Sequence, residues 1–309
     1  MKAQAKMNHL GNNNSALSHK ASQLQDFTRV RRVGVAIMFV ALYVLLDRST
    51  VFFQMWSGVS AWYPPSGLSL AMLIGFGSSY VPLVMLGGLI AGIANYHQPF
   101  FSYSTIGANL AVSGGYWAAA FVLRKVLKID ARLRSMRDIF RLLLVSLASS
   151  CAVAFAGVLM GVADHTIKPS EYLHASITWW VGDAVTLASL TPFLLMYVMP
   201  GLLQFCRVPG TETVERAEET DGLRRSSHTM PVWIETLLLT ASMAGTLWIV
   251  FLGSYSRRSE LFYLLFLPII WTAVRRGLRG VTAGILALNF GIIILLRIYP
   301  EDNHPYRAI

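Results

Sequence analysis

The sequence contains few charged residues and few cysteines. Only 14% of its 309 residues are Asp, Glu, Lys or Arg, whereas an ordinary soluble domain has about 25%. Cys151 falls in a predicted membrane span and Cys206 in a predicted loop, so we expect free thiols and no disulfide framework. C-x-x-C, H-E-x-x-H and P-loop patterns are missing, and the His residues are scattered singly. We therefore expect no metal site, no nucleotide site and no cofactor.

Long apolar runs take the place of these features. A membrane-spanning helix needs roughly 20 apolar residues, and runs of about this kind recur at 33–53, 64–77, 80–96, 103–123, 139–162, 172–198, 232–252, 261–274 and 280–297. The pattern predicts an all-α fold, a polytopic integral membrane helical bundle of about nine transmembrane helices. The second and third runs are short, so they are either a helical hairpin or partly re-entrant segments.

The basic residues are distributed unevenly between the two sides of the predicted bundle. Under alternating crossings, 20 of the 26 Lys and Arg fall on one side, in the N-terminal tail and in the loops 75–81, 124–141, 199–231 and 275–279. Basic residues favour the cytoplasmic side. The asymmetry predicts a cytoplasmic N-terminus and a C-terminus outside, and it accounts for the net charge of +10 without nucleic acid.

The same distribution divides the chain. We expect residues 1–32 to be a disordered, basic cytoplasmic tail and residues 33–298 to be the membrane domain. A charge-rich cytoplasmic loop, 199–231, interrupts that domain, and residues 299–309 form a short tail that is predicted to be periplasmic.

One acid lies deep in the sixth run. Asp183 is about 11 residues from the nearer polar flank, roughly 16 Å into the membrane. A charged carboxyl there costs at least ~2.5 kcal/mol, so it needs a polar partner, a water cavity or a proton. We expect hydrogen bonds from Trp179 or Trp180 if the helix is distorted at Gly182. Otherwise Asn109 or Asn289 would be the donor.

Aromatic residues and prolines mark the start of the second run: Trp62, Tyr63, Pro64 and Pro65. Prolines suit the first turn of a helix, and aromatic pairs suit the membrane interface, so a plain helix start is one interpretation. The other is an outward-facing cavity with aromatic walls and Asp183 as its floor. Its remaining members would be Asn95, His97, Asn109, His174, Trp179 and Trp180. Asp47 and Glu235 lie near membrane surfaces, and we expect them to snorkel or to cap helices.

Three motifs carry a resemblance to a known family. They are Trp62-Tyr63-Pro64-Pro65-Ser66-Gly67-Leu68, Trp179-Trp180-Val181-Gly182-Asp183 with Pro192 downstream, and Ala273-Val274-Arg275-Arg276-Gly277-Leu278-Arg279-Gly280. Over about residues 33–297 the chain resembles the bacterial membrane-associated sensor domain of type one. The resemblance implies a sensory input domain in the bacterial inner membrane, without enzymatic activity. It relays a stimulus to a histidine kinase of a two-component system or to cyclic-di-GMP enzymes.

The chain departs from the family pattern at three places. Ser78 and Ser79 stand where family members usually carry Arg, and Arg276 stands where an aromatic residue is usual. No output domain follows the last span, so we expect an output protein in trans. The resemblance leaves the stimulus undefined. It also leaves open whether the chain forms a homodimer. The candidate ligand-binding or signalling residues are Trp62, Tyr63, Pro64, Pro65, Asn109, Trp179, Trp180, Gly182, Asp183 and Arg275.

Two other function classes compete with a sensor. A small-solute or proton transporter would use the intramembrane Asp183, although no inverted repeat is evident. A membrane-embedded enzyme acting on lipid or peptidoglycan precursors would need a second acid or a His at the same depth, and none is expected there.

Overall fold

The computed structural model describes residues 28–50, 54–56, 59–60, 62–97, 99, 101–206, 231–252 and 261–298. Residues 28–50 form a helix, and a two-stranded antiparallel ribbon follows, β1 (Gln54–Trp56) and β2 (Val59–Ser60). The remaining helices are α2 (Pro64–Phe76), α3 (Val81–Tyr96), α4 (Tyr103–Phe121), α5 (Met136–Ala163), α6 (Tyr172–Phe193), α7 (Met199–Phe205), α9 (Val232–Leu252) and α11 (Phe266–Ile298). Short helical segments join some of them: η2 (Ser78–Tyr80), η3 (Val122–Val126), η4 (Pro169–Glu171), η5 (Leu194–Val198) and η7 (Phe262–Leu265).

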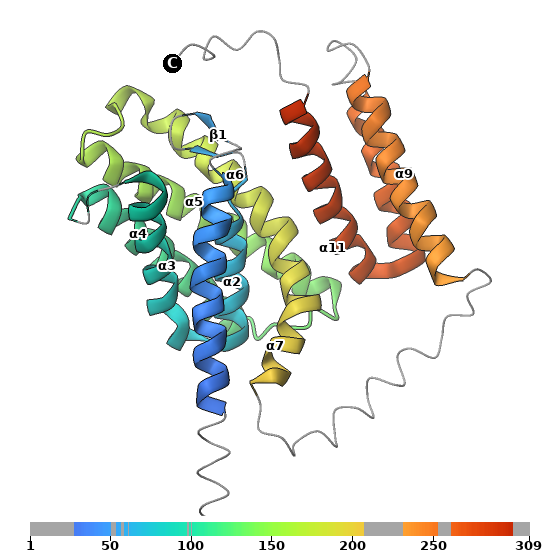
Figure 1. Cartoon of the computed structure of the whole chain (residues 1–309), viewed down its shortest axis with the longest axis horizontal. Coiled ribbons are helices and arrows are strands. Elements are labelled where there is room, and N and C mark those ends of the chain that lie inside the picture. Colours follow the sequence, from blue (N-terminus) through green and yellow to red (C-terminus); the bar gives the residue numbers. More distant parts are fainter. Residues whose placement is uncertain are drawn as a thin grey trace, which may run out of the picture.

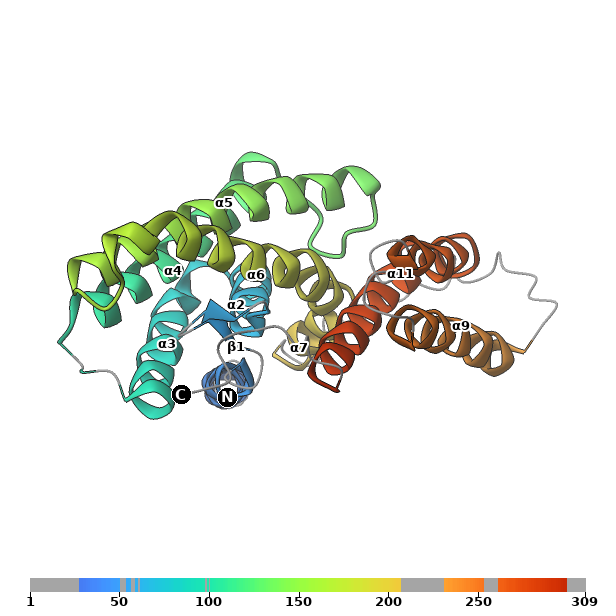
Figure 2. The same ribbon diagram turned by 90° about the horizontal axis from the view of Figure 1, so that it is seen from above.

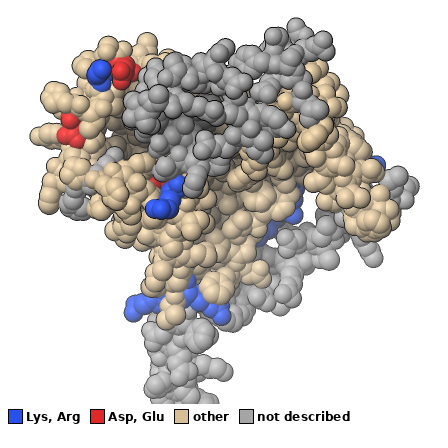
Figure 3. All heavy atoms as spheres, turned by 45° about the horizontal axis from the view of Figure 1, so that its top comes forward, with Lys and Arg blue, Asp and Glu red and all other residues tan. Residues whose placement is uncertain are grey.

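The fold is an all-helical membrane bundle apart from the small ribbon (Figure 1). Six helical stretches among the described residues are long and apolar enough to cross a membrane. The helix over 28–50 and the shorter α2 cover the first two apolar runs. Most of the described surface in Figure 3 is uncharged, as expected for helices that face lipid.

Helix boundaries differ from the expected ones at two points. Helix is already present at residue 28, inside the expected tail, and α7 continues to Phe205, inside the expected loop. The last two apolar runs both lie in α11, in which Gly277 has non-helical backbone angles. Figures 1 and 2 show the chain turning there, so α11 consists of two arms. Most of the expected tail 1–32, of the loop 199–231 and all of 299–309 lie outside the described residues.

The short helix α2 lies at the centre of the main core. It begins at Pro64, as the two prolines predicted, and ten of its 13 residues are buried. At 1.5 Å per residue it is about 20 Å long, less than the ~30 Å hydrocarbon thickness. It packs against α4 and α6, and Gly67 lets α6 approach, since a Cβ there would lie 3.2 Å from Thr186 and Leu190. Helix α2 is therefore an internal part of the bundle.

A second, smaller core lies between α9 and α11, and Figure 2 shows this pair beside the main bundle. Two polar contacts join the pair to η5, which follows α6. The Tyr197 hydroxyl donates to the Arg279 carbonyl at 2.9 Å, and the Thr282 hydroxyl lies 3.7 Å from the sulfur of Met196.

One end of the bundle is basic. There the Arg31 guanidinium donates to the Phe205 carbonyl at 3.1 Å and lies 5.0 Å from the centre of the Phe205 ring. We call this end, which also carries Arg124 and Lys125, the basic end. At the opposite end, Asp164 accepts hydrogen bonds from the Ser104 hydroxyl at 2.6 Å and from its backbone N–H at 3.2 Å. These bonds hold the pKa of Asp164 below its usual range.

Candidate functional site

Asp183 lies in the middle of the bundle and is closed off from solvent. Asp183 is 1% exposed, and the Tyr116 hydroxyl of α4 donates a short hydrogen bond to its Oδ2. Tyr116 itself is fully buried. The Ser66 hydroxyl of α2 and the Trp179 indole also lie near the carboxyl. The deep acid therefore has a polar partner from another helix, as its burial required, but it is not the floor of an open cavity.

A second buried carboxyl lies near the end of the first helix. Asp47 is 2% exposed, so it does not snorkel to the surface as expected. The Tyr63 hydroxyl donates to its Oδ1 at 2.8 Å, and the Asn95 amide of α3 donates to its Oδ2 at 2.7 Å. Each oxygen thus has a partner from a different segment, which offsets part of the cost of burial.

Tyr43 lies beside Tyr63 in the bundle. It is 1% exposed, and its hydroxyl lies 3.5 Å from that of Tyr63. The Tyr63 N–H in turn donates to Thr186 of α6, the helix that carries Asp183. We call the set Tyr43, Asp47, Tyr63, Asn95, Tyr116 and Asp183 the buried polar network. It joins the first helix, the start of α2, α3, α4 and α6.

The Trp-Tyr-Pro-Pro entry is fixed to α6 by its backbone. The Tyr63 N–H donates to the Thr186 hydroxyl at 3.0 Å, and that hydroxyl donates to the Gly182 carbonyl at 2.9 Å. The Ser66 hydroxyl donates to the Tyr63 carbonyl at 2.8 Å. The prolines, which have no N–H to satisfy, begin α2 beside these contacts. The entry is thus held one helical turn from Asp183.

Trp62 points to a different part of the molecule from Tyr63. It is 3% exposed, and its ring packs edge-on against Phe290 of α11, with centroids 4.7 Å apart and an interplanar angle of 74°. Trp62 therefore contacts the α9–α11 pair, whereas Tyr63, the next residue, belongs to the buried polar network.

The tryptophan pair attaches α6 to α5. The Trp180 indole donates to the Leu147 carbonyl at 3.1 Å, and the Trp179 ring covers Gly157, where a Cβ would lie 2.8 Å from it. Helix α6 is regular at Gly182, and its π-helical segment, η5, comes only after Pro192. The expected distortion at Gly182 is therefore not present.

Asn109 lies away from Asp183. Its amide donates to the Thr105 carbonyl of its own helix at 2.7 Å, and its oxygen lies against Gly88 of α3. The expected donor is thus replaced by Tyr116, which lies two turns further along the same face of α4, at the level of Asp183.

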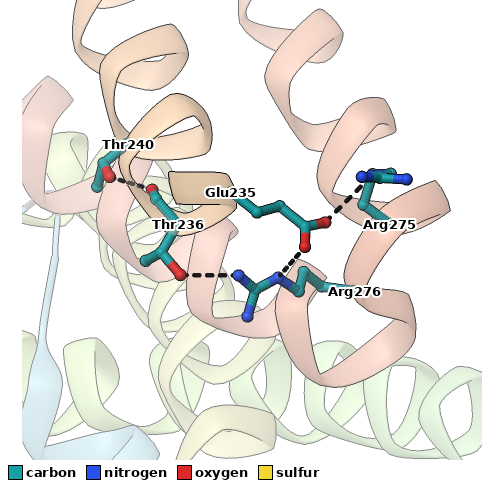
Figure 4. Close-up of polar contacts among 5 residues, drawn as sticks. All are labelled: Glu235, Thr236, Thr240, Arg275 and Arg276. Atoms are coloured by element: carbon teal, nitrogen blue, oxygen red, sulfur yellow. Dashed lines mark hydrogen bonds and ion pairs between the residues drawn. The ribbon is translucent and has the colours of Figure 1, made fainter. Parts of the chain in front are cut away.

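An ion cluster around the buried Glu235 carboxyl holds the turn of α11 to α9. Figure 4 shows the Glu235 carboxylate between two arginines, with Arg275 Nε 3.1 Å and Arg276 Nε 3.7 Å from its oxygens. Arg276 also donates to the Thr236 hydroxyl at 2.7 Å. The Glu235 side chain is 3% exposed, so this acid does not snorkel to solvent as expected.

Sequence reasoning singled out Asp183, Tyr63 and Arg275, and it named Trp179 as a neighbour of Asp183. It did not find Tyr116, Asp47 and Glu235, the partners of these three residues. Tyr43 and Asp47 are four residues apart, which places them on one helix face. That spacing was the available signal. Tyr116 and Glu235 gave no local signal, because their partners are distant in the sequence.

Comparison with known proteins gives one match. The model of the MASE1 family matches residues 32–303, nearly the whole chain. No curated protein and no solved structure matches it.

Proposed function

The chain belongs to the MASE1 family of membrane sensor domains, and we propose that it relays a stimulus across the membrane to a signalling output protein. The output is a histidine kinase or an enzyme of cyclic-di-GMP signalling. The candidate signalling residues are those of the buried polar network together with Trp62, Pro64, Pro65, Trp179, Trp180, Gly182 and Arg275. Asn109 has a packing role in this proposal.

The position of Trp62 and Tyr63 carries the proposal. Tyr63 donates to Asp47, and its backbone is bonded to α6 beside Asp183. Trp62 packs on Phe290 of α11. Because the two residues are adjacent in the chain, a rearrangement of the buried polar network shifts the Trp62–Phe290 contact. A packed core responds to such a shift by changing between discrete arrangements.

The relay therefore ends in the α9–α11 pair. Its two helices are tied by Glu235 and the two arginines at the basic end. We place this end in the cytoplasm, where the output protein would bind, because Lys and Arg favour that side. A reporter inserted at residue 218 is expected to be active in the cytoplasm, and a reporter fused after Ile309 outside it.

The test uses the partner that co-purifies from native membranes. Capture of a histidine kinase or a cyclic-di-GMP enzyme supports the proposal, and its activity is then measured with each variant. Phe290→Leu changes the contact with Trp62 without creating a large internal cavity, since Phe290 is 41% exposed. Phe266→Leu, in the same helix and 57% exposed, is the matched control. We expect Phe290→Leu and Asp183→Asn to change the output and Phe266→Leu to leave it unchanged.

A proton transporter is the second candidate, and the second buried carboxyl favours it. Asp47 and Asp183 each accept a hydrogen bond from a tyrosine hydroxyl inside the bundle, and intramembrane acids of this kind mark proton pathways. Proton flux in proteoliposomes that Asp47→Asn and Asp183→Asn both abolish would support transport. An impermeable parent protein would exclude it.

A further inference from the structure

A cleft opens at the basic end between the turn after α2 and the last turns of α4. Its volume is about 220 Å³, the space of roughly seven water molecules. Small-molecule pockets usually hold ~300–1,000 Å³, so this cleft accommodates a small polar group and not a whole solute. Its lining residues are Leu73, Phe76, Gly77, Ser78, Trp117, Ala120, Phe121, Arg124 and Lys125.

Two cations and no acid line the cleft. Arg124 and Lys125 lie in the π-helical segment η3, and both are exposed. Arg124 uses one Nη1 contact, to the Leu73 carbonyl at 3.3 Å near the end of α2. A guanidinium has five N–H donors, so further donors are available to a ligand. The chemistry of the lining selects an anion with several acceptor oxygens, such as a phosphate.

Gly77 gives Arg124 its position. Its φ of 94° is unfavourable for residues with a side chain, and a Cβ there would lie 2.5 Å from Nη1 of Arg124. The glycine thus allows both the turn after α2 and the approach of the guanidinium.

The other wall of the cleft is aromatic and faces outward. Trp117 is 42% exposed and Phe121 is 47% exposed, on the same side of α4. The Trp117 indole donates to the Ser78 hydroxyl at 3.1 Å, which fixes the ring beside the cations. An aromatic ring with a polar end next to Lys and Arg is typical of the headgroup level of a membrane.

We propose that this cleft binds the phosphate group of an anionic phospholipid. Arg124 and Lys125 contact the phosphate oxygens, Ser78 lies at the entrance, and the acyl chains run along Trp117 and Phe121. The site is separate from the buried polar network, so it does not depend on the proposed signalling function.

The full chain in nanodiscs provides the test. Nanodiscs of phosphatidylcholine alone are compared with mixtures containing phosphatidylglycerol, and retained lipid is measured by native mass spectrometry. A hydrogen bond to a charged group contributes about tenfold or more in affinity. We therefore expect Lys125→Gln to weaken phosphatidylglycerol retention by about tenfold and Arg124→Gln/Lys125→Gln to weaken it further. Arg137→Gln, an exposed cation of the same end outside the cleft, should retain lipid like the parent.

Three outcomes would overturn the proposal. One is equal retention by the parent and the double variant. The second is an equal loss in Arg137→Gln, which would mean unspecific attraction to the surface. The third is that inorganic phosphate displaces phosphatidylglycerol from the parent in detergent and raises the melting temperature of the protein as much as phosphatidylglycerol does. That result would identify a soluble phosphate as the occupant. Because Lys125 is exposed, Lys125→Gln should fold like the parent, so a loss of lipid in this variant is not a result of misfolding.

Discussion

Tyr116→Phe isolates the hydrogen bond to the deepest acid. The substitution removes one hydroxyl and keeps the ring, at a position where both partners are buried. It leaves the Asp183 carboxyl with one donor fewer inside the bundle, which costs ~1–3 kcal/mol. For a domain of this size a loss of 1 kcal/mol lowers the melting temperature by ~2–4 °C. We expect a decrease of roughly 2–12 °C in detergent.

The assay is thermal unfolding of purified variants, with Tyr103→Phe as the control. Tyr103 is 71% exposed, so losing its hydroxyl should have no measurable effect. Asp183→Asn keeps an acceptor for Tyr116 and should be destabilised less than Asp183→Ala. In a double-mutant cycle, Tyr116→Phe and Asp183→Ala should be less than additive by ~0.5–3 kcal/mol. A Tyr116→Phe protein that melts like the parent, or strictly additive effects, would refute the assigned hydrogen bond.

Three further substitutions test other parts of the fold. Glu235→Ala should lower the melting temperature more than Glu235→Gln, because it removes the acceptor group that holds both arginines of the α11 turn, and equal effects would contradict the ion cluster. Asp164 has a lowered pKa, so its contribution is present above the usual carboxyl pKa of ~4 and is lost as the pH falls below it; Asp164→Asn should destabilise the protein slightly at pH 7, and a gap that widens in acid would be inconsistent. Gly277→Ala should destabilise by ~1–3 kcal/mol because its φ of 60° is strained for alanine, whereas Gly245→Ala, in open space within α9, should be neutral or stabilising.

The apolar runs predicted the helices well because lipid imposes a simple requirement. Backbone groups in a membrane must be satisfied within a helix, so a run of about 20 apolar residues is sufficient evidence. The last two runs correspond to the two arms of α11, which meet at the non-helical backbone of Gly277. The ribbon β1–β2 has no counterpart in the hydropathy pattern, since it contains only five residues.

The partners of the acids were not predictable in the same way. Asp183 could be placed in depth from its own run, but Tyr116 is 67 residues away, and a tyrosine in an apolar helix is indistinguishable from a core aromatic. Asp47 and Glu235 were misinterpreted because distance to the nearest flank was the only criterion. That criterion ignores the packing of neighbouring helices, which closes over both acids.

The buried acids share an arrangement that bears on function. Each one joins segments that hydrophobic packing alone would hold in many registers: Asp47 to Tyr63 and Asn95, Asp183 to Tyr116, and Glu235 to the turn of α11. Helices in lipid gain little from apolar burial against one another, so such polar contacts determine their relative positions. A change in the charge or hydrogen bonding of one acid therefore alters a helix–helix contact and not only a local side chain. Since Tyr63 and Trp62 connect the first two acids to α11, and Glu235 fixes α11 to α9, the three polar contacts lie along one physical path through the bundle.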